Sequence, residues 1–137
     1  MWKFIKPGLL VGGLWLVAIV FLGGCVGSVE LASGHRIALN SKEFEDYVER
    51  IFKYQNKVAD ELAFALVDMD AAQPSYGALE SAEAQLLIAC SGLNELATAR
   101  RDDLQLSIRR KLELARQVPN CEQAADVASA ALRAASV

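Results

Sequence analysis

Residues 40–69 read NSKEFEDYVERIFKYQNKVADELAFALVDM, and this stretch decides the fold class. Its apolar residues recur in alternating steps of four and three, which is the spacing of one face of an α-helix. That face consists of Phe44, Val48, Ile51, Gln55, Val58, Leu62, Ala65 and Met69. We predict a long helix that begins at Asn40 or Ser41, with Asn40 and Glu43 forming a capping box. A face this broad must pack against other helices.

Two apolar residues of this helix fall outside the pattern. Phe64 and Val67 lie on the opposite face, among charged side chains. One interpretation is that the following loop covers this end of the helix. The other is that both side chains contact a partner.

Three more helices are expected after a turn at residues 70–77, which contain Pro74 and Gly77. The apolar face of the second contains Leu79, Ala82, Leu86, Ala89, Cys90, Leu93 and Ala97. That of the third contains Leu104, Ile108, Leu112, Ala115 and Val118, and the helix ends before Pro119. The fourth is capped by Asn120 and presents Cys121, Ala125, Ala128, Leu132 and Ala135. The sequence therefore predicts an all-α fold, an antiparallel bundle of about four helices (two long, two short) over residues 40–137.

Residues 1–25 contain Lys3 and Lys6, an apolar run from Leu9 to Leu22, and the sequence Leu22-Gly23-Gly24-Cys25. This layout is typical of a secretory signal, and its end resembles the lipobox of bacterial lipoprotein precursors. The resemblance implies that residues 1–24 are a cleaved signal peptide and that Cys25 receives a diacylglycerol and an acyl chain such as palmitate. By the same resemblance, Val26 in the next position favours the outer membrane, with the protein on its periplasmic face. The alternative is an uncleaved membrane anchor, for which the apolar run is short.

The segment between this signal and the first helix, residues 25–39, reads as a lipidated N-terminus followed by a flexible tether. Gly27, Ser28, Ser33 and Gly34 interrupt it, and it shows no helical period. A short strand at residues 28–32 is conceivable, but it would lack partners.

Two cysteines remain after Cys25, and in an oxidising periplasm such a pair favours a disulfide between Cys90 and Cys121. The alternative is two buried thiols. Residues 78–117 contain no proline, so one long helix is also conceivable. A disulfide needs Cα atoms within about 7 Å, which requires a turn near the midpoint of the two cysteines. We therefore predict a turn at residues 101–103, with Asp102 or Asp103 capping the third helix.

Charge and composition exclude several functions. From Cys25 onward the chain has 12 basic and 17 acidic residues, a net charge of −5, which argues against nucleic acid as a partner. The only histidine, His35, lies in the tether, and no nucleophile–base pattern, glycine-rich phosphate loop or metal-ligand spacing is present. We expect no enzyme activity, no cofactor, no metal and no small-molecule substrate.

Two candidate sites remain. Because two short helices cannot cover a long hairpin, an apolar groove could stay open near Pro74. The alternative is that the fourth helix covers it, or that the same residues pack against one another and close the hairpin. The groove would be lined by Leu62, Leu66, Met69, Leu79 and Leu86. The second site is a basic surface, which could instead be a solvated face with acidic neighbours. It comprises Arg100, Arg101, Arg109, Arg110, Lys111 and Arg116.

Each site corresponds to one expected function. The groove suits a membrane-tethered envelope lipoprotein that acts as an adaptor or assembly factor for another envelope protein. Such a protein would be similar to secretion pilotins in size, lipidation, helicity and disulfide only. The basic surface suits a structural or lipid-associated surface lipoprotein whose third helix contacts anionic head groups.

Overall fold

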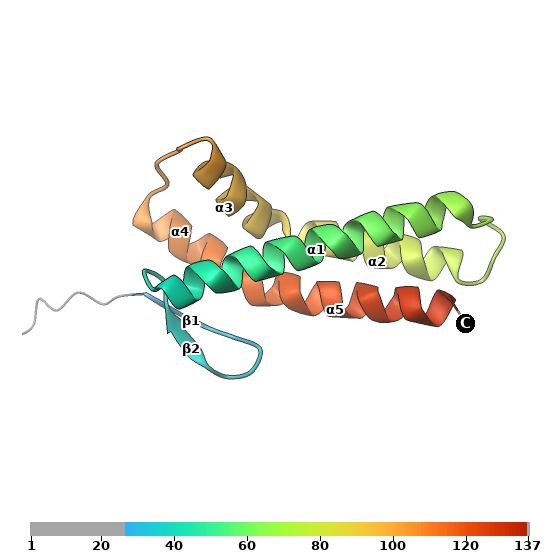
Figure 1. The fold of residues 1–137 in the computed structure, drawn as a ribbon, viewed down its shortest axis with the longest axis horizontal. Helices are drawn as coiled ribbons and strands as arrows, with labels where there is room; N and C mark the ends of the chain where they lie inside the picture. The colour runs from blue at the N-terminus through green and yellow to red at the C-terminus, as the bar shows by residue number, and fades with distance from the viewer. Residues whose placement is uncertain (1–26, 137) are drawn as a thin grey trace, which may run out of the picture.

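The computed structural model describes residues 27–136, so Cys25 and the expected signal peptide lie outside the described residues. Within this range the chain forms two short strands and five helices (Figure 1). They are β1 (Ser28–Glu30), β2 (Arg36–Ala38), α1 (Lys42–Asp68), α2 (Tyr76–Ala89), α3 (Ser91–Arg101), α4 (Ile108–Ala115) and α5 (Val118–Ala135). The prediction of an all-α bundle is confirmed.

The body of the molecule is a three-helix bundle of α1, α2 and α5, which run side by side along the long axis (Figure 1). Leu62, Leu79 and Leu86 are fully buried between these helices. On α5 the buried positions include Ala125 and Ala128, whose small side chains let the helix axes approach closely. The expected lengths were wrong, because α5 has 18 residues and the second predicted helix is divided at Cys90 into α2 and α3.

Helices α3 and α4 form a hairpin, which we call the arm, that leaves the bundle at Cys90 and returns to it at α5 (Figure 1). The predicted turn is confirmed, because α3 ends at Arg101 and Asp103 adopts a left-handed backbone with φ of 52°. The predicted cap is wrong: Asp102 is the C-cap of α3, and the N-cap of α4 is Ser107, whose hydroxyl accepts a hydrogen bond from the backbone N–H of Arg110.

The predicted disulfide is present and closes the base of the arm. The Cα atoms of Cys90 and Cys121 lie 4.5 Å apart, and both residues are fully buried. The disulfide therefore joins the point where the arm leaves the bundle to the point where it returns.

Residues 28–38 are not a tether, which corrects the expectation for this segment. β1 and β2 pair antiparallel, with Val29 opposite Ile37, and both side chains are buried in the same core as α1. A tight turn joins the strands, in which Gly34 has a φ of +80° and donates to the carbonyl of Leu31. The strand expected to lack partners thus has one, because the chain reverses within five residues of it.

Helix α1 begins as predicted after Ser41, but the capping box is wrong. The Ser41 hydroxyl accepts from the backbone N–H of Phe44, at 3.1 Å, and so satisfies a free donor of the first turn. Glu43 instead lies 3.3 Å from Nε2 of His35. Of the predicted face of α1, five residues are buried and three, Val48, Ala65 and Met69, are only partly buried. Tyr47, which flanks this face, is buried as well.

Candidate functional site

The expected apolar groove does not exist. Leu62, Leu79 and Leu86 have no exposed surface, and Leu66 and Met69 are partly buried against the same core. Helix α5 covers the α1–α2 hairpin along its length, as the alternative interpretation had it. A helix of 18 residues spans about 27 Å, which is enough to reach the end that the prediction left open.

Phe64 and Val67 remain exposed, so the interpretation that a loop covers them is wrong. Their exposed fractions are 74% and 83%. On a helix with about 100° per residue, both point away from the buried Leu62. They lie near the end of α1 that is farthest from β1 and the arm (Figure 1). We call this pair the distal apolar patch.

Other large apolar side chains are also exposed among the described residues. On the arm these are Leu104 (59%) and Ile108 (85%), which corrects the prediction that both lie on the buried apolar face of the third helix. The sequence offered a signal for this outcome, because Asp102, Asp103 and Ser107 surround Leu104 with residues that favour turns. The remaining ones are Leu87 and Ile88 on α2 and Val127 on α5.

Two of the predicted basic residues serve the structure of the arm. Arg110 donates two hydrogen bonds to the carboxylate of Glu95, at 2.6 and 2.9 Å, and a third to Glu113. These hydrogen bonds raise the pKa of Arg110, and they lower the pKa of Glu95. The bidentate pair joins α4 to α3. Arg101 pairs with the neighbouring Asp102.

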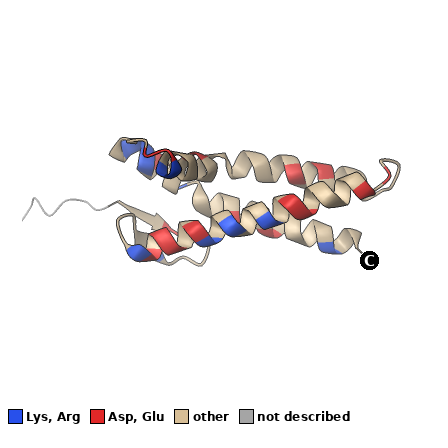
Figure 2. Cartoon of the chain, turned by 45° about the horizontal axis from the view of Figure 1, so that its top comes forward, with Lys and Arg blue, Asp and Glu red and all other residues tan. Residues whose placement is uncertain are grey.

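The other four basic residues are exposed, and no carboxylate of residues 27–136 lies within 4 Å of their charged groups. They are Arg100, Arg109, Lys111 and Arg116. Figure 2 shows basic residues on the arm, at the same end of the molecule as the first described residues. The basic surface is therefore partly a set of internal ion pairs and partly a set of free cations.

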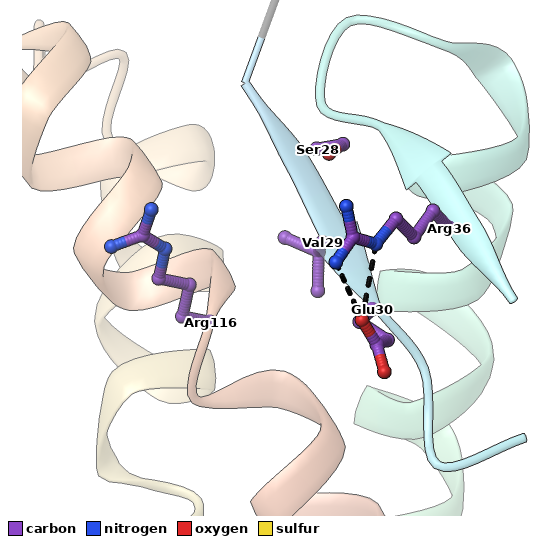
Figure 3. A pocket seen from close by; sticks show the side chains of 5 residues that line it. All are labelled: Ser28, Val29, Glu30, Arg36 and Arg116. Carbon is purple, nitrogen blue, oxygen red and sulfur yellow. Dashed lines mark hydrogen bonds and ion pairs between the residues drawn. The ribbon is translucent and has the colours of Figure 1, made fainter. Parts of the chain in front are cut away.

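A small open pocket lies between β1 and the end of α4 (Figure 3). It has a volume of about 380 Å³ and is lined by Ser28, Val29, Glu30, Arg36 and Arg116. Glu30 and Arg36 neutralise each other through contacts of 3.0 Å. The pocket contains no nucleophile paired with a base. Within the described range, no cluster of three or more potential metal ligands occurs, and no helix is long and apolar enough to cross a membrane.

Comparison with known families, curated proteins and solved structures found no match. The distal apolar patch and the arm are the two surfaces whose exposed apolar and basic side chains best fit a binding role.

Proposed function

We propose that this protein is a lipid-anchored, non-enzymatic adaptor or assembly factor of the bacterial envelope, which binds another envelope protein through its distal apolar patch. The lipobox Leu22-Gly23-Gly24-Cys25 supports the anchor. The exposure of Phe64 and Val67 carries the proposal of a partner. This patch replaces the groove as the adaptor's binding surface.

The energy available from the patch fits a specific but modest contact. Burying one large apolar side chain contributes about 1.5–3 kcal/mol. A partner that covers both Phe64 and Val67 therefore gains about 3–6 kcal/mol before the costs of association. Residues 64 and 67 are three positions apart on one helix face, so an apolar groove or helix of the partner can cover both at once.

The position of the patch supports the same function. Phe64 follows Lys42 by 22 residues, which is about 33 Å along α1. The chain enters the domain at the other end of α1, where β1 begins (Figure 1). An anchor attached upstream of β1 thus leaves the patch accessible to a partner.

A photo-crosslinking amino acid at position 64 of the full chain, in a producing bacterium, tests this function. We expect one discrete adduct, which a Val67→Asp substitution abolishes. Lys53 is a matched control, because it is exposed on the same face about 16 Å nearer the start of α1. Equal adducts at positions 53 and 64, or an adduct at 64 that survives Val67→Asp, would contradict the proposed partner site.

A lipid-associated role is the second candidate, and the free cations of the arm favour it. Residues 100–116 contain six basic and three acidic side chains, a net charge of +3, in a chain that is otherwise acidic. Both roles can coexist, because the arm and the distal apolar patch lie at opposite ends of the molecule (Figure 1).

A further inference from the structure

Helix α4 carries an apolar strip between two cationic flanks. At about 100° per residue, Ile108 and Leu112 lie about 40° apart on one face. Arg109 lies about 80° from the centre of this pair on one side, and Lys111 about 80° on the other. Arg116 falls on the same flank as Arg109. An apolar strip with basic flanks is the pattern of a helix that lies in a membrane interface.

The strip passes from the core of the protein to its outside. Ala115 is buried, Leu112 is partly buried, and Ile108 at the first turn is 85% exposed. Leu104, in the turn before α4, is also mostly exposed. The strip therefore extends beyond the body of the domain, and its free end is the tip of the arm, which we define as Leu104, Ile108, Arg109 and Lys111.

The chain enters the domain beside this strip. A Cβ placed on Gly27 would lie 3.1 Å from a methyl group of Leu112, so the backbone of Gly27 runs close to α4. Two extended residues span at most about 7 Å, which is the greatest distance that the chain can add between Gly27 and Cys25. A lipid on Cys25 would thus hold α4 close to the membrane surface.

We propose that the tip of the arm rests in the interface of an anionic phospholipid bilayer, with Leu104 and Ile108 at the acyl boundary and Arg109 and Lys111 at the phosphates. The location of this bilayer rests on the proposed lipid anchor. Charge favours lipid over a second copy of the chain, because two tips would bring like charges together. Each cation near an anionic surface strengthens binding about fivefold. Asp103, in the same turn, opposes this attraction.

A fluorophore that reports its environment tests the inference in the full chain reconstituted into phosphatidylcholine–phosphatidylglycerol vesicles. It is attached at Ile108→Cys and, as a control, at Ile88→Cys, an isoleucine 75% exposed on α2. We expect doxyl-labelled lipid to quench the label at 108 and not the label at 88. In the Ile108→Cys background, Arg109→Glu with Lys111→Glu should lower the equilibrium constant for insertion at least 30-fold.

The outcomes separate this inference from the anchor. Vesicle-bound protein whose label at 108 is as exposed to water as the label at 88 would overturn the inference and leave the anchor standing. Quenching at 108 that persists without anionic lipid and after the double charge reversal would also overturn it. If protein recovered from the producing bacterium lacks acyl chains, the anchor is refuted. Quenching at 108 in that protein would still support the inference.

Discussion

Removal of the Cys90–Cys121 disulfide should destabilise the protein by roughly 3.5–4 kcal/mol. The two cysteines are 31 residues apart, and closing a loop of this length lowers the entropy of the unfolded chain by a corresponding amount in the chain-entropy model. Replacing both residues by alanine tests this value, because both side chains are fully buried and alanine is small enough to fit. The loss is large for a domain whose total stability is about 5–15 kcal/mol.

The structure also predicts where the variant becomes less ordered. The disulfide closes the base of the arm, and the Arg110–Glu95 pair holds α3 to α4 but not to the bundle. Amide hydrogen exchange in the Cys90→Ala/Cys121→Ala variant should therefore accelerate more in the arm than in α1. The amides of the three-helix bundle should stay better protected from hydrogen exchange than those of the arm.

Urea unfolding followed by circular dichroism measures the change in stability. Wild-type protein with reductant is the matched control, and its stability should fall close to that of the double variant, which reductant should not affect. A double variant within 1 kcal/mol of oxidised wild type, or equal exchange in the arm and in α1, would refute the reasoning.

Three further predictions concern other parts of the fold. Ile37→Ala should cost about 2–4 kcal/mol in urea unfolding, because Ile37 is buried in the core; a negligible loss would mean that residues 28–38 are a tether after all. Burial and the hydrogen bond to Glu122 raise the pKa of Tyr47 above its usual 10.0. The unfolded chain loses that proton first, so stability should fall as the pH rises above 10, and less steeply in Tyr47→Phe; identical pH profiles would contradict this. Gly77→Ala should stabilise the protein by about 0.4–1 kcal/mol in thermal unfolding, because Gly77 lies in the first turn of α2 with nothing within 4 Å of an added Cβ. A loss of stability there would indicate a contact that the structure does not contain.

Periodicity and cysteine geometry predicted much of the bundle. The steps of four and three along α1 located Phe44, Ile51, Val58 and Leu62 in the core, because one buried face imposes the helical period. The pairing of Cys90 with Cys121 required a reversal between them, and the turn after Arg101 supplies it.

Tertiary contacts decided what the sequence left open. The predicted groove is closed because α5, with Ala125 and Ala128 among its buried positions, packs against both α1 and α2. The division at Cys90 has no breaker in the sequence, since Gly92 lies inside α3. The strand at Ser28–Glu30 was considered but expected to lack a partner, because the sequence does not show its pairing with β2 or the burial of Val29 in the common core.

The candidate site was predicted less well, because periodicity shows which residues share a helix face but not whether another element covers that face. Ile108 fits a helical apolar face, yet that face extends past the body of the domain. Arg110 looked like a surface cation in the sequence, but Glu95, 15 residues earlier, pairs with it across the arm. Phe64 and Val67 break the pattern of α1, and both side chains are exposed in the structure.

The intact mass of the protein recovered from the membrane fraction of a producing bacterium, before and after reduction, tests the account most directly. We expect the mass of residues 25–137 plus a diacylglycerol and an acyl chain, with two hydrogens gained on reduction. The unmodified mass of the whole chain from Met1 would contradict the lipid anchor, and with it the orientation proposed for the arm and the distal apolar patch.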